Sequence, residues 1–160
     1  MVVSNTSPLN YLILIEQIDV LPRLYDRLII PPSVNQELRA QQTPESVRTW
    51  IRDPPNWLEI SSEAGSPDST LDGLHAGERD AISLALRVRA DALIIDERRG
   101  RIEAEERGLK VIGTMGVIAS AHERGLLDLT SSITRLLQTT FHVSPKLLAA
   151  LMQRYENPRQ

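Results

Sequence analysis

The segment 77–114, GERDAISLALRVRADALIIDERRGRIEAEERGLKVIGT, decides the fold because helix-like and strand-like stretches alternate along it. Residues 77–89 carry apolar side chains at helical spacing, whereas residues 92–95 form a continuous apolar run typical of a buried strand. A second helix is predicted for about residues 98–107, and a second strand for residues 109–112. Single helices between strands indicate parallel pairing through right-handed crossovers.

The same alternation continues on both sides of this segment. It predicts strands at residues 2–4, 28–30 and 57–60, and helices that begin near residues 6, 20, 33, 43, 114, 131 and 144. Ser33 is the predicted cap of the third of these helices. We therefore expect an α/β fold, a three-layer α/β/α sandwich around a central parallel sheet of four or five strands. Residues 1–160 are expected to form a single domain, with C-terminal helices at about 131–155 that pack on its core or on a partner.

The composition excludes several classes of function. A chain of 160 residues without cysteine cannot hold a disulfide scaffold, a thiolate zinc site or a catalytic thiol. Aromatic residues make up only 4% of the chain, which disfavours an aromatic platform for stacking bases. The net charge of −3 disfavours a protein that coats nucleic acid by bulk electrostatics. An enzyme that handles nucleic acid through bound cations is compatible with this charge.

The N-terminal part of the chain shows no signal for a membrane or for secretion. The longest apolar run near the start, Tyr11–Ile15, is much too short to span a bilayer. No Lys or Arg precedes Arg23, so the basic region of a secretory signal is missing. We therefore expect a soluble, cytoplasmic protein without membrane partners.

Polar side chains are predicted to gather at one edge of the sheet. Asn5 and Asp96 directly follow apolar strands, Glu37 lies in the first turns of a helix after a strand, and Glu78 opens the helix before the Asp96 strand. These positions all lie at the carboxyl edge of a parallel sheet, where ligands bind in such folds. Clustered carboxylates repel each other unless a cation lies among them. An oxygen-only set suits Mg²⁺ or Mn²⁺, ions that activate water for attack on phosphodiesters.

Each of these residues also has a structural explanation. Asp96 is a suitable cap for the helix that follows it, and Asn5 suits a turn or a cap. Glu37 fits a solvated helix face, and Glu78 fits the positive N-terminal end of its helix. Glu97 competes with Asp96 as a ligand, but we expect it to face away from the site. The histidines show no metal-ligand spacing.

Four stretches, in this order, resemble the motifs of the PIN-domain family. They are VSNTSPL at Val3–Leu9, IPPSVNQEL at Ile30–Leu38, GERDAISLA at Gly77–Ala85 and LIIDE at Leu93–Glu97. The resemblance runs from Val2 to about Phe141 and is greatest to a branch related to the toxin ribonucleases of prokaryotic toxin–antitoxin pairs.

The resemblance implies a metal-dependent ribonuclease with Mg²⁺ or Mn²⁺ as cofactor. Carried over motif by motif, the catalytic and metal-binding residues would be Asn5, Glu37, Glu78 and Asp96. The family usually has Asp where this chain has Asn5. An amide oxygen can bind a cation but brings no negative charge, so metal affinity and cleavage rate should both be lower than with Asp.

We expect the substrate to be RNA and its contacts to include Thr6 and a basic rim formed by Arg98, Arg99 and Arg101. Local positive charge is needed because the chain is acidic overall. The rim arginines could instead pair with acidic residues on their own helix. The resemblance also implies an antitoxin partner and a homodimer, with apolar side chains of the C-terminal helices as the interface.

Two other functions remain open at this point. The first is a catalytically weak or inactive PIN domain that binds RNA or a protein partner, and Asn5 is its main support. The second is a phosphoacceptor domain that uses Asp96 at a strand end and Thr114 after the next strand. It is disfavoured because a paired acid cluster after the first strand is missing.

Overall fold

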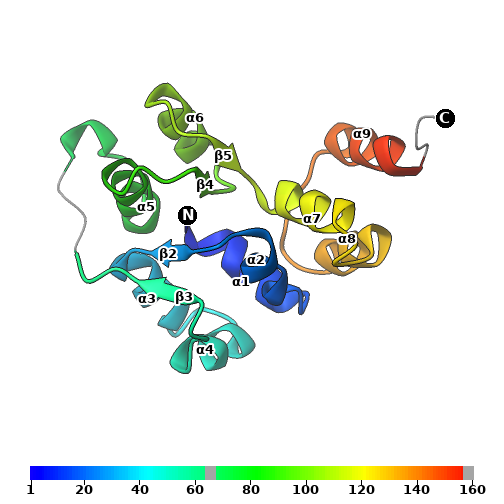
Figure 1. Ribbon diagram of the computed structural model, residues 1–160, viewed down its shortest axis with the longest axis horizontal. Coiled ribbons are helices and arrows are strands. Elements are labelled where there is room, and N and C mark those ends of the chain that lie inside the picture. Colours follow the sequence, from blue (N-terminus) through cyan, green and yellow to red (C-terminus); the bar gives the residue numbers. More distant parts are fainter. Residues whose placement is uncertain (64–67, 157–160) are drawn as a thin grey trace.

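The core of the molecule is a five-stranded, all-parallel sheet in the order β3-β2-β1-β4-β5 (Figure 1). It is seen in a computed structural model that describes residues 1–63 and 68–156. The strands are β1 Val2–Ser4, β2 Leu28–Ile30, β3 Leu58–Ile60, β4 Ala92–Ile94 and β5 Val111–Ile112. The predicted α/β fold with a parallel sheet is thus confirmed, and the sheet has five strands, the larger of the two numbers expected.

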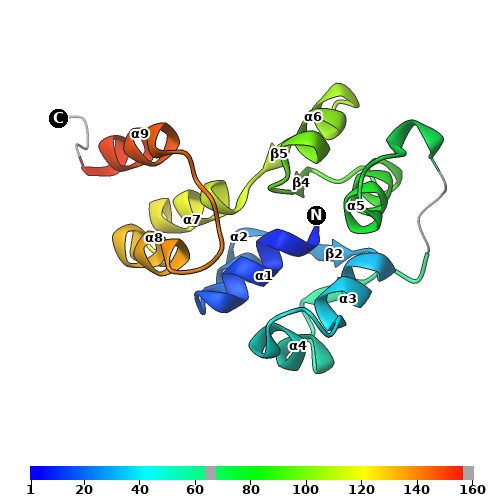
Figure 2. The same cartoon turned by 180° about the vertical axis from the view of Figure 1, so that it is seen from behind.

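Helices follow or precede every strand, as the alternation in the sequence predicts. They are α1 Thr6–Leu14, α2 Leu21–Leu24, α3 Pro32–Arg39, α4 Glu45–Arg52, α5 Ala76–Arg87, α6 Arg98–Glu106, α7 Thr114–Glu123, α8 Leu129–Leu137 and α9 Pro145–Glu156. Short 3₁₀ turns cover Ile18–Val20 and Ser69–Leu71. Figures 1 and 2 show α7, α8 and α9 gathered at one end of the molecule, away from α3, α4 and α5.

The strands are apolar on both faces because each face packs against its own set of helices. Val2 and Leu28 belong to a core with α1, α3, α4, α7 and α8. Their neighbours Val3 and Ile29 belong to a second core with α5 and α6. Side chains of a strand alternate between the two faces, so the sheet separates two helical layers. This is the physical reason why the strands show unbroken apolar runs.

Two predicted boundaries differ from the structure. Helix α3 starts at Pro32, so Ser33 lies inside the first turn and is not the predicted cap. Proline suits the first helical position because its fixed φ is helical and its missing N–H needs no partner there. Strand β5 covers only Val111–Ile112, although a strand was predicted over 109–112.

The C-terminal helix α9 packs on the first core through one side only. Leu148, Leu151, Met152 and Tyr155 are partly buried against that core. Arg154 and the Tyr155 hydroxyl both donate to Glu123 Oε1 on α7, which ties the end of α9 to the domain. Leu147, in the first turn of the helix, is 53% exposed.

In residues 1–63 and 68–156, none of the helices combines the length and the apolar character that crossing a bilayer requires.

Candidate active site

The sheet register brings the ends of β1 and β4 together. Ser4 pairs with Ile94, and the Asn5 N–H donates to the Ile94 carbonyl at 2.9 Å. The residues after both strands therefore emerge side by side at the carboxyl edge of the sheet, where parallel α/β folds bind ligands.

A cavity of about 560 Å³ contains three of the predicted site residues, Asn5, Glu37 and Glu78. Its other lining residues are Thr6, Ser7, Gln42, Thr43, His75, Ala76 and Glu97. The cavity is therefore lined largely by oxygen-bearing side chains from the ends of β1 and β4 and from α1, α3 and α5. The predicted convergence is seen for these three residues.

Asn5 occupies the N-cap position of α1, but its side chain does not form the capping hydrogen bond. The residue is only 3% exposed, and its Oδ1 is buried with no hydrogen-bond partner among the residues described. A buried acceptor without a partner destabilises the fold by about 1–3 kcal/mol. Capping therefore does not explain this side chain, whereas a cation in the cavity would give its oxygen a partner.

Glu37 is held by donors from two other elements. Its Oε1 accepts the backbone N–H of Gly77 at 2.9 Å, and its Oε2 accepts the hydroxyl of Thr6. A Cβ added at Gly77 would lie 2.5 Å from Glu37 Oε2, so only glycine leaves room for the carboxylate. Glu37 is therefore a positioned carboxylate, which excludes the solvated helix face considered above. Thr6 is its positioning partner and also lines the cavity.

Glu78 is 6% exposed and combines a structural contact with a perturbed charge. Its Oε2 accepts the backbone N–H of His75 at 3.2 Å, so it does serve the start of α5. Burial raises the pKa of the Glu78 carboxyl, and the nearby charges of Glu97 and Glu37 raise it further, against the lowering effect of the His75 hydrogen bond. A buried carboxyl with a raised pKa, located in a cavity, is typical of functional sites.

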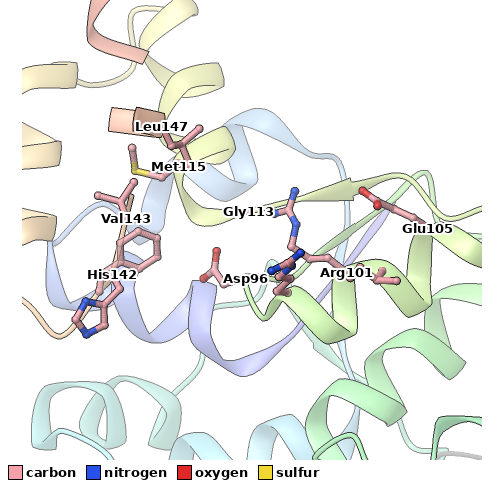
Figure 3. A pocket seen from close by; sticks show the side chains of 11 residues that line it. Asp96, Arg101, Glu105, Gly113, Met115, His142, Val143 and Leu147 are labelled. Carbon is pink, nitrogen blue, oxygen red and sulfur yellow. The ribbon is translucent and has the colours of Figure 1, made fainter. Parts of the chain in front are cut away.

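Asp96 does not join the other three residues, which corrects the expected convergence of all four. It lines a second cavity of about 490 Å³, and Figure 3 draws the side chains that line this cavity. Thr114 donates to Asp96 from its backbone N–H and from its hydroxyl, each at 2.7 Å. Glu97, which was expected to face away, lines the first cavity instead. It also occupies the N-cap position of α6 that was considered for Asp96.

The alternation of side chains along an extended backbone explains why Glu97, and not Asp96, lines the first cavity. Ile94 packs in the first core and Ile95 in the second. Continued alternation directs Asp96 to the layer that contains α7, and Glu97 to the layer that contains α5. The two consecutive acids therefore face different cavities.

Of the three arginines of the predicted basic rim, two line a cavity and the third does not. Arg98 and Arg101 line the cavity around Asp96. Arg99 donates to the carbonyl of Gly73 at 3.0 Å, and Gly73 has a φ of +99°, a conformation that favours glycine. Arg99 therefore stabilises the turn before α5 and lines neither cavity.

The first cavity has the right kind of atoms for a hard divalent cation. Its candidate ligands, the Asn5 amide and the carboxylates of Glu37, Glu78 and Glu97, are all oxygen donors, which Mg²⁺ and Mn²⁺ prefer. In the described part of the chain, no three His, Asp or Glu side chains already stand close enough together to enclose a metal ion. The fit to a metal rests on the donor chemistry and on the unpartnered Asn5 oxygen.

Asp96→Asn should make the free energy of unfolding less dependent on pH. Burial raises the pKa of the Asp96 carboxyl, against the lowering effects of the Thr114 hydrogen bonds and of Arg101. The folded protein therefore binds this proton more tightly than the unfolded chain does. Its contribution to stability is full below the unfolded pKa of about 3.9 and is lost as the pH rises through the folded pKa. The amide of the variant keeps one acceptor and one donor for Thr114, so the variant should gain stability relative to wild type as the pH rises.

Urea unfolding in EDTA between pH 3.5 and pH 7 measures this difference. Asp68→Asn is the control of opposite sign, because hydrogen bonds from Thr70 lower the pKa of that exposed carboxyl. That variant should lose stability relative to wild type over the same range. A constant difference between wild type and Asp96→Asn at all pH values would contradict the burial argument.

Sequence reasoning missed Gly77 as the residue that holds Glu37, and it paired Thr114 with Asp96 only in the phosphoacceptor alternative. Gly77 contacts Glu37 across 40 positions of the chain, and Thr114 contacts Asp96 across 18 positions. No local pattern marks such pairs, although Gly77 stands directly before Glu78 in a quoted motif.

The comparisons with known proteins agree with this architecture. The family model described as PIN domain matches residues 1–157. The structure is similar to a PilT N-terminus domain protein from the hyperthermophilic archaeon Sulfolobus solfataricus P2, with a TM-score of 0.53 and 16% sequence identity. That similarity covers 89% of this chain and 98% of the archaeal chain, and at this identity it concerns the fold alone. No match is found among curated proteins. Because the family model spans nearly the whole chain, the protein belongs to the PIN-domain family.

Proposed function

We propose that this PIN domain is a divalent-metal-dependent ribonuclease that hydrolyses RNA phosphodiester bonds with Mg²⁺ or Mn²⁺. PIN domains are generally nucleases, which gives the class of reaction. The observation that carries the proposal is the buried, unpartnered Oδ1 of Asn5, a residue that lines the same cavity as Glu37, Glu78 and Glu97.

The side chains of the cavity divide the work in this proposal. Asn5, Glu78 and Glu97 would hold the cation, which supplies charge neutralisation and an activated water when bound. Glu37 is fixed by Thr6 and Gly77 and sets the negative potential of the cavity. Burial raises the pKa of the Glu78 carboxyl, and the charge of a bound cation would favour the ionised form that binds it. Asp96 accepts two hydrogen bonds from Thr114 at the start of α7 and lines the second cavity.

A toxin-like role, with an antitoxin partner and a homodimer, is part of the same proposal. It is supported by the apolar side chain of Leu137 on α8, which is 45% exposed. Exposed large apolar residues on amphipathic helices are typical of surfaces that bind another protein.

The alternative function is an RNA- or protein-binding module with little or no catalysis. It is favoured by the amide at position 5 and by the orientation of Asp96 toward Thr114, which together leave fewer charged ligands in the first cavity.

Cleavage of single-stranded RNA by the purified protein separates the two functions. We expect cleavage with Mg²⁺ or Mn²⁺, none in EDTA, and a several-fold slower rate in Gly77→Ala. This variant alters no charge but pushes a methyl group to 2.5 Å from Glu37 Oε2, so the carboxylate must move. Cleavage that persists in EDTA and is unchanged in Gly77→Ala would exclude the proposed site. Retained RNA binding without cleavage would favour the alternative.

A further inference from the structure

The cavity around Asp96 differs from the first cavity because one of its sides is apolar and the other is basic. Figure 3 shows Met115, Val143 and Leu147 on one side of Asp96, and Arg101 on the other. Its volume of about 490 Å³ is within the range of small-molecule sites. From these walls, and resting on the proposed ribonuclease function, we propose that this cavity binds one nucleotide of the RNA strand that flanks the cleaved bond. Its phosphate would face Arg98 and Arg101, and its base would lie against the apolar wall.

The basic side of the cavity is arranged around backbone contacts. Arg101 Nη1 donates to the Ile95 carbonyl at 3.3 Å, and a Cβ at Gly113 would lie 2.7 Å from the same nitrogen. The guanidinium is therefore held against a glycine at the edge of the cavity that it lines. Arg98 is exposed at the start of α6 and lines the same cavity. Two guanidinium groups on one wall suit a phosphate, which accepts paired N–H donors.

The Asp96 carboxylate, one of the two acids that line this cavity, does not oppose that assignment. Both Asp96 oxygens already accept hydrogen bonds from Thr114. The carboxylate is also close enough to Arg101 for the two charges to interact. A phosphate on the arginine side would therefore meet an Asp96 carboxylate whose oxygens are both engaged by Thr114, and Glu105, one helical turn from Arg101, is the second acid of the lining.

The apolar side offers a surface for one base. Phe141 stands edge-to-face against Tyr11 with ring centroids 5.0 Å apart, so one aromatic ring of the wall is held in place. Met115 and Val143 extend this apolar wall. Leu147 also lines the cavity, and its side chain is 53% exposed. A nucleobase has an apolar face that gains free energy by leaving water for such a wall. The low aromatic content argues against an extended stacking platform but is compatible with a single pocket.

The position of the cavity relative to the acidic one supports a flanking nucleotide. Asp96 and Glu97 are consecutive, yet each lines a different cavity. A strand that crosses the backbone at residues 96–97 would pass from the acidic cavity into the cavity with the arginines. The second cavity therefore suits a neighbouring nucleotide better than a separate ligand.

Methionine methyl resonances provide a direct test, because the chain has only three methionines. Met115 lines the cavity, whereas Met1 lies at the far end of β1 and Met152 lies on α9. Protein labelled at the methionine methyl groups is titrated with single-stranded hexaadenylate and hexauridylate RNA in EDTA, so that cleavage does not consume the probe. We expect the Met115 signal to shift while the Met1 signal stays in place. An unchanged Met115 signal at saturating RNA would overturn the proposal.

Matched variants test the two walls separately by fluorescence polarisation with the same RNAs. Arg98→Ala should weaken binding and lower the slope of log K against log salt by about 0.7, the effect of one lost contact to a single-stranded phosphate. Leu147→Asp should weaken binding roughly tenfold through the lost apolar contact. The controls are Arg52→Ala on α4 and Leu137→Asp on α8, which are exposed residues of the same types outside this cavity.

An abasic nucleotide introduced at each RNA position in turn adds a double-variant comparison. At one position, the abasic nucleotide should weaken binding of the RNA to the wild-type protein. It should not weaken binding to Leu147→Asp, because that variant has already lost the contact with the base. Equal effects of the cavity variants and their controls would overturn the nucleotide site. Lost self-association in Leu147→Asp with unchanged RNA binding would also overturn it, and would assign the wall to a protein interface. RNA that binds as expected but is not cleaved with Mg²⁺ would contradict the proposed ribonuclease while leaving this site supported.

Discussion

Glu78→Gln is expected to lower the rate of Mg²⁺-dependent RNA cleavage by about 100-fold, because the variant removes a negatively charged ligand of the proposed cation. At the same time the metal-free protein should become more stable at neutral pH. Burial raises the pKa of the Glu78 carboxyl, so its ionised form destabilises the metal-free fold. The variant removes that charge but keeps an oxygen that can accept the His75 N–H.

These two effects have opposite signs, which separates a functional role from a structural one. A purely structural capping role would make Glu78→Gln neutral or destabilising at every pH. Single-turnover cleavage with Mg²⁺ and urea unfolding in EDTA at pH 4 and pH 7 measure the two quantities. Glu45→Gln is the matched control, because Glu45 also lies in the first turn of a helix but is exposed. Unchanged cleavage in a folded Glu78→Gln protein would remove this residue from the site.

Asn5→Asp is expected to tighten Mn²⁺ binding about tenfold and to raise the cleavage rate. One added charge about 4 Å from another is worth on the order of 4 kcal/mol at an effective dielectric constant of 20. Desolvation of the ion and the waters that it keeps reduce this to about 1.4 kcal/mol, which corresponds to a factor of ten. Without metal the variant should be less stable, because a charge replaces a neutral amide at a position only 3% exposed.

Calorimetric titration of wild type and Asn5→Asp with Mn²⁺ measures the affinity, and urea unfolding in EDTA measures the metal-free stability. Asn56→Asp adds the same charge at an exposed position before β3 and controls for net charge. Equal Mn²⁺ affinities in wild type and Asn5→Asp would mean that the side chain at position 5 does not bind the ion. The site would then consist of carboxylates alone.

The two acids that follow β4 show where sequence reasoning stopped. The apolar run and the acids after it correctly placed Asp96 and Glu97 at the carboxyl edge of the sheet. Which of them faces the acidic cavity depends on how far the extended backbone continues beyond Ile94. A shift of a single residue moves each side chain to the opposite face. Periodicity alone does not locate a strand end to that precision.

The sequence by itself determined the parallel α/β fold, the family, and three residues of the acidic cavity. It could do so because apolar periodicity and the ends of strands can be read from the local sequence. In a parallel sheet, the residues that follow the strands all lie at the same carboxyl edge. Only the tertiary structure decided that Asn5 Oδ1 is buried without a partner, that Gly77 makes room for Glu37, and that Asp96 belongs to a second cavity. These features depend on contacts between residues far apart in the chain, such as Asp96 with Thr114, and such contacts form only when the layers pack.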